Sequence, residues 1–195
     1  MLEKLLQLDT EFFLFLNGWG NPTWDSFCLL LSEKWIGLPL VILFLYGALQ
    51  QLGPKKTAIS IVFISLIILC SDQLANLFKD GLARPRPCFE PQLEGLFRLV
   101  KSNCGGAYGF FSAHAANSMG IAIFMASILK NKWKWFVFPS VGLALLIGYS
   151  RIYIGVHYPL DVLFGFGVGA FFAFLGQKIF KAQIIIKTPQ KHNGL

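Results

Sequence analysis

Apolar runs, each about as long as a bilayer is thick, dominate this chain. They begin near residues 24, 57, 112, 135 and 158, with short polar turns between them. About 20 apolar residues span the hydrocarbon core, so the 195 residues allow at most about five or six crossings. Only 14% of the residues are charged, where a soluble domain carries about 25%. The sequence predicts an all-α integral-membrane helical bundle and excludes a disordered, collagen-like or nucleic-acid-binding protein.

We expect a single membrane domain over residues 1–195. Residues 1–23 mix leucines and phenylalanines with acidic residues, which favours an amphipathic helix lying at the interface. Residues 24–180 form the transmembrane bundle with a long polar loop at 81–111, and 181–195 form a tail. The start carries Glu3, Asp9 and Glu11 and lacks a basic lead and a small-residue cleavage site, so it does not resemble a signal peptide.

The distribution of lysines predicts the orientation of the bundle. Nine lysines fall on one side of the predicted crossings, with no acidic residue among them: Lys55, Lys56, Lys130, Lys132, Lys134, Lys178, Lys181, Lys187 and Lys191. By the positive-inside rule this side is cytoplasmic. The C-terminal tail then lies inside. The 81–111 loop and the turn around residues 151–157 lie together on the extracytoplasmic face.

Ionisable residues gather on that outer face, where interfacial snorkelling is the alternative explanation to a binding site. Asp72, Asn76 and Lys79 recur at helical spacing, so we expect them to line one face that looks into the bundle. In "KDGLARPRP" a rigid proline-containing turn aims Lys79 and Arg86 at one anion.

Ser112 opens the third long apolar run in "GFFSAHAANS". A helix N-terminus favours a phosphate, because its unpaired N–H groups and dipole point at the ligand. A plain helix cap is the alternative reading of Ser112. His114 follows as a candidate proton donor for a leaving oxygen, or as a satisfied interfacial histidine.

The segment "SRIYIGVHYPLD" favours a phosphate site over a plain helix cap at Ser112 and an interfacial histidine at His114. Asp161 follows His157 by four residues, one helical turn if a helix begins near Pro159. A carboxylate there holds the Nδ1–H of the imidazole and leaves Nε2 free as a nucleophile for phosphorus. Arg151 neutralises the phosphoryl oxygens.

These three motifs, in this order and spacing, resemble the type-2 phosphatidic acid phosphatase superfamily. The resemblance covers residues 79–161 and implies that His157 is the nucleophile, Asp161 its orienting partner and His114 the acid. It implies that Lys79, Arg86, Ser112 and Arg151 bind the phosphate. Where the family has Pro-Ser-Gly-His, this chain has Phe111-Ser112-Ala113-His114, which leaves the shape of that loop open.

The resemblance implies a bacterial inner-membrane hydrolase that acts on a lipid phosphate, with undecaprenyl diphosphate as the first expectation. Phosphatidylglycerophosphate, phosphatidic acid and lipid A phosphates follow, and a phosphotransferase would share every residue named. A non-catalytic transporter or binding protein for anionic lipids is the alternative of another class. We expect no metal and no cofactor. The clustered cations and the helix end can supply the charge stabilisation that a metal ion would give. No feature points to an obligate protein partner.

Four cysteines are too few for a disulfide scaffold, and none has zinc-ligand spacing. Cys28 and Cys70 lie in apolar runs and are expected to be buried thiols. Cys88 and Cys104 sit in the polar loop. A bridge between them would close a modest loop and needs an oxidising compartment, so bridged and free forms both stay open.

Overall fold

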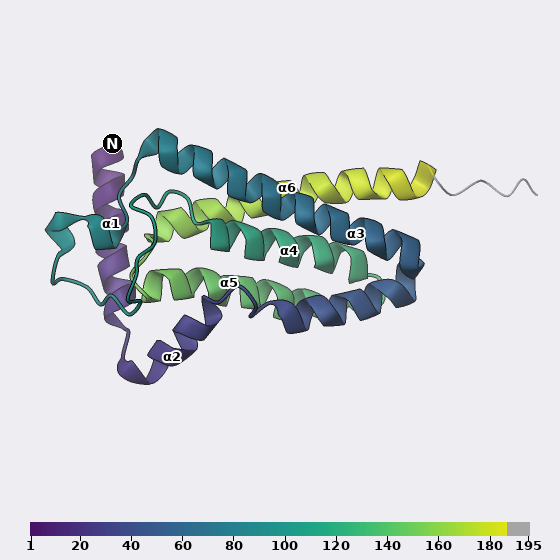
Figure 1. Cartoon of the computed structure of the whole chain (residues 1–195), viewed down its shortest axis with the longest axis horizontal. Coiled ribbons are helices and arrows are strands. Elements are labelled where there is room, and N and C mark those ends of the chain that lie inside the picture. The colour runs from purple at the N-terminus through teal and green to yellow at the C-terminus, as the bar shows by residue number, and fades with distance from the viewer. Residues whose placement is uncertain (187–195) are drawn as a thin grey trace, which may run out of the picture.

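The computed structural model describes the backbone of residues 1–186 and finds helices and connections there, with no strand. Figure 1 shows the main elements in chain order. They are α1 (Leu2–Gly18), α2 (Pro22–Leu31), α3 (Leu38–Leu82), η1 (Pro87–Phe89), η2 (Pro91–Leu93), α4 (Ala113–Leu129), η3 (Lys134–Phe136), α5 (Val137–Tyr153) and α6 (Pro159–Ile186). The all-α membrane fold expected from the sequence is confirmed.

A sharp reversal at Gly53 divides α3 into two halves that run back along each other (Figure 1). Gly53 adopts φ 74° and ψ 172°, which favours glycine, and Pro54 follows it without an N–H to donate. Counting both halves of α3 with α4, α5 and α6, the chain runs along the bundle five times. The helices over 38–82, 134–153 and 159–183 are long and apolar enough to cross a membrane, and α4 is a shorter apolar helix.

Two helix boundaries differ from the ends of the predicted apolar segments. The apolar run that begins near Trp24 does not form one helix: α2 ends at Leu31, and a turn precedes α3, which starts at Leu38. The turn holds the exposed charges of Glu33 and Lys34, which interrupt the apolar run and favour contact with water. At the other end α6 continues past residue 180 to Ile186, since no Gly or Pro stops it. The predicted positions of Lys187 and Lys191 lie outside the described residues.

Among the described elements, α4 and α6 make the most extensive contact, and the glycines of the last crossing predict such a close approach. A Cβ at Gly165 would lie 2.6 Å from the carbonyl oxygen of Ser112, and one at Gly169 would collide with that of Ala116. Gly167 meets nothing within 4 Å, so two of the three glycines make the approach. This packing places the start of α4 directly against the first turns of α6.

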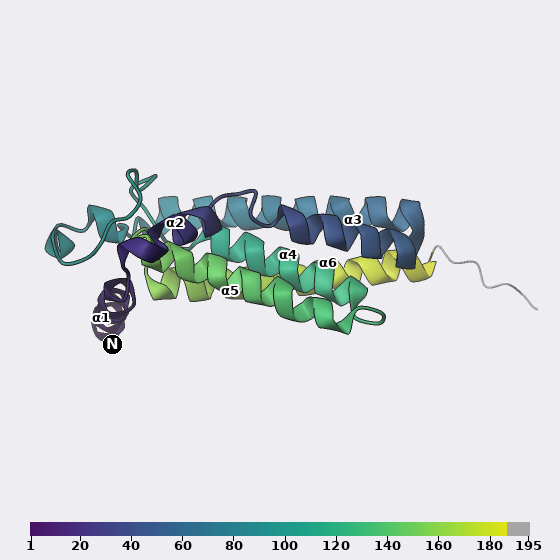
Figure 2. The ribbon, with the colours of Figure 1, turned by 90° about the horizontal axis from the view of Figure 1, so that it is seen from below.

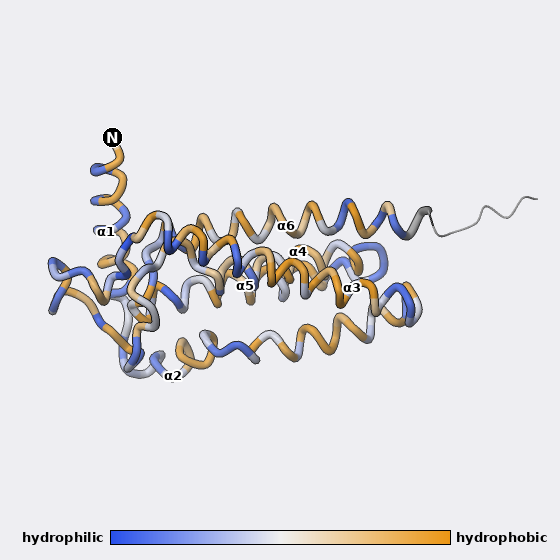
Figure 3. The backbone as a smooth tube through the Cα atoms, turned by 45° about the horizontal axis from the view of Figure 1, so that its top comes forward, coloured by the Kyte–Doolittle hydropathy of each residue, from blue (hydrophilic) through white to orange (hydrophobic). Residues whose placement is uncertain are grey.

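Polar residues gather at the two ends of the bundle (Figure 3). One end carries α1, α2 and the loop between α3 and α4, while the other carries the kink of α3 and the turn between α4 and α5 (Figures 1 and 2). The helix α1 lies across the axis of the other helices (Figure 1). Both polar loops of the candidate site therefore share one end, as predicted.

Candidate active site

His157 and Asp161 meet where α6 begins. His157 lies in the connection after α5, and Asp161 lies in the first turn of α6, which starts at Pro159 as the spacing predicts. The Nδ1 atom of His157 is 3.2 Å from Oδ2 of Asp161, which also accepts the backbone N–H of Tyr158 at 3.0 Å. An ionised carboxylate only accepts, so Nδ1 carries the proton and Nε2 keeps its lone pair.

Burial keeps the His157 ring neutral. The residue is 2% exposed, and loss of hydration lowers its pKa from 6.5 to about 4. The hydrogen bond and charge of Asp161 oppose this shift, while the nearby charges of Arg86 and Arg151 add to it. The imidazole is therefore unprotonated at neutral pH, which is the form a nitrogen nucleophile needs.

Beside this pair, buried hydrogen-bond donors stand without partners. Ser112 is 0% exposed and Arg151, in the last turn of α5, is 4% exposed. Within the described part of the chain, the Ser112 hydroxyl and the Nε and Nη1 atoms of Arg151 have no hydrogen-bond partner. Buried unpaired donors are costly, and Ser112 sits at the N-terminus of α4 without capping it. The arrangement provides the donors and positive charge that bind a phosphate.

Three further predicted residues lie around these donors. Arg86 is held by the loop, because its Nε donates to the carbonyl of Tyr108 at 3.1 Å and its Nη1 to that of Cys104 at 2.9 Å. Lys79 is half-buried in the last turn of α3, within electrostatic range of Arg86 and Arg151. His114 is half-buried in the first turn of α4, within range of Arg151 and His157.

The structure thus brings the two predicted catalytic histidines and all the predicted phosphate-binding residues to one end of the bundle.

The prediction for the face of the second crossing is only partly right. Asp72 is half-buried and accepts a hydrogen bond from Asn117 at 2.8 Å, but Asn76 is exposed. The spacing places Asn76 on the same helical face as Asp72 and Lys79, but that face is only partly covered, and Asn76 lies at its exposed part.

Cys88 and Cys104 form a disulfide that ties η1 to the far side of the loop. The backbone carbonyl of Cys104 also accepts a hydrogen bond from Arg86. The disulfide therefore helps to fix the position of the Arg86 side chain. Of the two free cysteines, Cys28 is buried as expected. Cys70 is exposed, against the prediction, because it points outward from α3.

Opening the disulfide is expected to weaken substrate binding more than catalysis. Replacing both Cys88 and Cys104 with serine frees the segment that orients Arg86, and one charge-assisted contact is worth about 1.5–3 kcal/mol. We expect KM for a lipid phosphate to rise about tenfold or more, with kcat changed less than about twofold, in steady-state assays. Cys70→Ser is the matched control and should leave both constants unchanged. An unchanged KM in the double variant would contradict the coupling.

Three residues of the site, Asp9, Arg84 and Gly109, were given no role in it from the sequence. Arg84 donates from Nη1 to Oδ1 of Asp161 at 2.8 Å, and from Nη2 to Oδ2 of Asp9 at 2.7 Å. Gly109 packs against His157 and Asp161, and a Cβ at this position would lie 3.2 Å from Oδ2 of Asp161. The available signals were a second arginine in "RPRP" and an acidic residue on the same side of the first helix as Phe13 and Asn17.

The fold is a membrane helical bundle, and its candidate site places an imidazole held by a carboxylate beside buried donors without partners. These features are typical of membrane proteins that bind phosphate groups. The chain matches the model of the PAP2 superfamily over residues 55–185 and belongs to that family. It is a membrane lipid phosphatase, a hydrolase of phosphate esters.

Similar proteins are known from several bacteria. The lipid A 4′-phosphatase of Porphyromonas gingivalis is 34% identical over 96% of this chain and 78% of that protein. The lipid A 4′-phosphatase of Bacteroides thetaiotaomicron is 35% identical over 100% of this chain and 88% of that protein. A solved transmembrane PAP2-type phosphatidylglycerolphosphate phosphatase from Bacillus subtilis has the same fold. Its TM-score is 0.70 at 21% identity, covering 93% of this chain and 88% of that one.

Proposed function

We propose that this phosphatase works through a covalent phosphohistidine at His157. The observation that carries the proposal is the pairing of a neutral, carboxylate-held imidazole with buried donors that lack partners. Lys79, Arg86, Ser112 and Arg151 are the groups that bind the phosphate oxygens. They also stabilise the charge that develops on those oxygens in the transition state.

In the first step, Nε2 of His157 forms a bond to phosphorus as the bond from phosphorus to the lipid oxygen breaks. The negative charge of the bound phosphate favours the protonated form of His114, which gives its proton to the leaving oxygen. The lipid leaves as an alcohol. For a diphosphate the leaving group is a lipid monophosphate. Asp161 keeps the proton on Nδ1 and stabilises the positive charge that the ring acquires.

In the second step, water attacks the phosphohistidine. His114, now neutral, takes a proton from the water as the new phosphorus–oxygen bond forms. The phosphorus–nitrogen bond breaks, its electron pair returns to Nε2, and inorganic phosphate leaves. A phosphotransferase would differ only in using another alcohol in place of water.

For the substrate we propose lipid A that carries a 4′-phosphate. Support comes from the two lipid A 4′-phosphatases that are 34% and 35% identical over nearly the whole chain. On this support we propose lipid A before undecaprenyl diphosphate, which was the first expectation from the motifs. The position of the site at the end of an apolar bundle suits either lipid, because acyl or prenyl chains can stay in the bilayer while the phosphate reaches the cations.

We propose that the site faces the extracytoplasmic side of a bacterial inner membrane. Lys55, Lys56 and the lysines of the turn after α4 lie at the opposite end of the bundle, which supports a cytoplasmic position for that end. The disulfide beside the site gives independent support, since disulfides persist in oxidising compartments.

A substrate panel tests the proposal. Purified protein in detergent is offered lipid A with a 4′-phosphate, undecaprenyl diphosphate, phosphatidic acid and phosphatidylglycerophosphate, each with and without a metal chelator. We expect phosphate release to be fastest from lipid A, by about tenfold in kcat/KM, and unchanged by the chelator. Faster hydrolysis of another lipid would move the assignment to that lipid, and loss of activity on chelation would contradict the metal-free scheme.

The same assay separates the alternatives. Adding an alcohol acceptor at rising concentration should leave a hydrolase producing inorganic phosphate, whereas a phosphotransferase would make the phosphorylated acceptor instead. A non-catalytic lipid-binding protein would bind the lipids and release no phosphate from any of them.

A further inference from the structure

The first helix buries two of its polar residues, Asp9 and Asn17, and leaves many of its large apolar residues exposed. Asp9, Phe13 and Asn17 form the buried face of α1, one turn apart. Large apolar side chains on its other faces are exposed: Leu5, Leu8, Phe12, Phe15 and Trp19. A water-soluble amphipathic helix has the reverse arrangement. The outer side of α1 thus suits lipid, and its buried polar groups need partners inside the protein.

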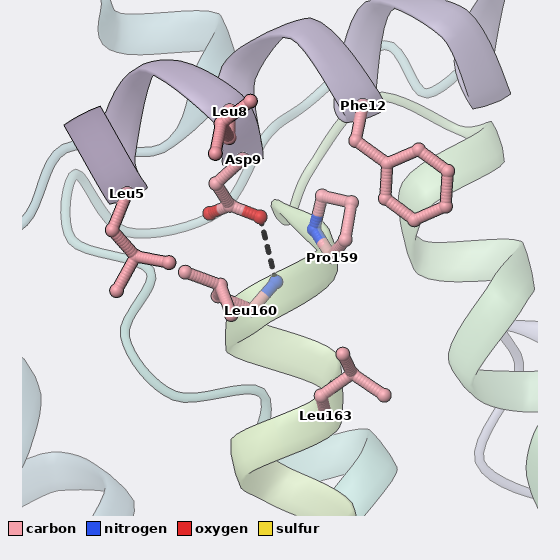
Figure 4. Close-up of a pocket in the computed structure, with 7 residues that line it drawn as sticks. All are labelled: Leu5, Leu8, Asp9, Phe12, Pro159, Leu160 and Leu163. Carbon is pink, nitrogen blue, oxygen red and sulfur yellow. Dashed lines mark hydrogen bonds between the residues drawn. The ribbon is translucent and has the colours of Figure 1, made fainter.

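Asp9 finds its partners at the catalytic end of the bundle. Its Oδ1 accepts the backbone N–H of Leu160 at 2.8 Å, in the first turn of α6 (Figure 4). Its Oδ2 accepts from Nη2 of Arg84 at 2.7 Å. Asp9 is 5% exposed. Leucines and Pro159 surround the carboxylate in an apolar groove between α1 and α6 (Figure 4), so both bonds are shielded from competing water.

Arg84 connects Asp9 to Asp161, the hydrogen-bond partner of His157. Its other terminal nitrogen, Nη1, donates to Oδ1 of Asp161 at 2.8 Å. The guanidinium also lies over the ring of Tyr158, 4.2 Å from the centroid, and the Arg84 carbonyl accepts the N–H of Gly109 at 2.9 Å. One arginine therefore joins two buried carboxylates from α1 and α6, and its side chain is held on several sides.

The two carboxylate oxygens of Asp161 accept hydrogen bonds from different donors. Oδ1 accepts from Arg84, which leaves Oδ2 for Nδ1 of His157 and the N–H of Tyr158. The direction of the carboxylate, and with it the direction of Nε2 of His157, depends on Arg84. Arg84 in turn is held by Asp9. A chain of hydrogen bonds runs from the membrane-surface helix to the nucleophile.

We propose that Asp9 and Arg84 are positioning residues for the phosphatase reaction, so that α1 is a working part of the active site. The inference rests on the proposed function. Asp9 anchors the first turn of α6 and fixes Arg84, and Arg84 fixes the Asp161 carboxylate that orients His157. Neither residue touches the phosphate. Their effect is on the geometry of attack, where a displacement of about 1 Å can cost about 100-fold in rate.

Asp9→Asn tests the proposal, because an NH2 group replaces one of the two carboxylate oxygens. Either the Leu160 N–H or Nη2 of Arg84 then faces another donor and loses its acceptor. We expect kcat to fall about tenfold or more while KM changes less than about threefold. Glu3→Gln, at an exposed acid on the same helix, is the matched control and should keep full activity. Arg84→Lys is a second variant that keeps the positive charge but can hold only one carboxylate well. It should lower kcat in the same way.

A double-mutant cycle distinguishes positioning from general structural support. If Asp9 acts through Asp161, then Asp9→Asn should cost less than about threefold in kcat once Asp161 is already asparagine. A purely structural role would give independent, multiplying losses that follow the amount of folded protein, measured by thermal unfolding in detergent. Multiplying losses, or an unchanged kcat in both Asp9→Asn and Arg84→Lys, would overturn the inference. The proposed function itself would fail differently, with no hydrolysis by the unmodified protein or full activity in His157→Ala.

Discussion

Replacing His157 with alanine is expected to lower kcat for lipid phosphate hydrolysis by about 10⁴-fold or more, because removal of a catalytic nucleophile has effects of about this size or larger. The change removes the only protein atom proposed to bond to phosphorus. It leaves the buried donors of Ser112 and Arg151 in place. Binding of the lipid phosphate should therefore change less than about tenfold, measured by titration with labelled substrate.

A chemical signature accompanies this loss. Unmodified protein quenched during turnover of a ³²P-labelled lipid phosphate should carry label that is stable to base and lost in acid, as expected for a phosphorus–nitrogen bond. His157→Ala should carry none. His192→Ala is the matched control: it changes the one histidine not assigned to the site, which lies outside the described residues, and should keep both turnover and label. Turnover at the normal rate in His157→Ala would refute the covalent route.

The sequence predicted the membrane bundle because its main signal, apolar runs of bilayer length, depends on composition alone. The glycines at 165 and 169 also predicted close helix packing, which the structure confirms. The end of α2 is hard to see in the sequence because the helix closes on three leucines, which continue the apolar run. Only the charges of Glu33 and Lys34 mark where it ends. Hydropathy measures how apolar a segment is and does not show which turn of a helix meets water.

Residues of the candidate site were predictable where the spacing stays within one helix or one tight turn. His157 and Asp161 are such a pair, four residues apart at a helix start, and the structure places them 3.2 Å apart. The role of Asp9 depends on contacts with residues 75 and 151 positions away in the chain. No local pattern encodes such contacts, so Asp9 looked like one polar position of a surface helix.

Replacing His114 with alanine is expected to have the second largest effect, and the size should depend on the leaving group. A lipid alkoxide is a poor leaving group and needs the proton that His114 supplies, so kcat should fall about 10²- to 10⁴-fold. An aryl phosphate such as p-nitrophenyl phosphate leaves readily without a proton. Its first step should therefore slow by less than about tenfold. The half-buried position of His114 in the first turn of α4, within range of His157, supports this role.

The two roles proposed for His114 make a sharper test possible. With the aryl substrate, His114→Ala should still form the phosphohistidine but lack the base that activates water, so the labelled protein should accumulate. Rapid-quench measurements should show a burst of p-nitrophenol close to one equivalent per site, followed by slow turnover. Asn117→Ala, three residues along the same helix, is the matched control and should show no burst. If His114→Ala slowed the aryl and lipid substrates equally, without accumulating label, His114 would serve only to bind phosphate.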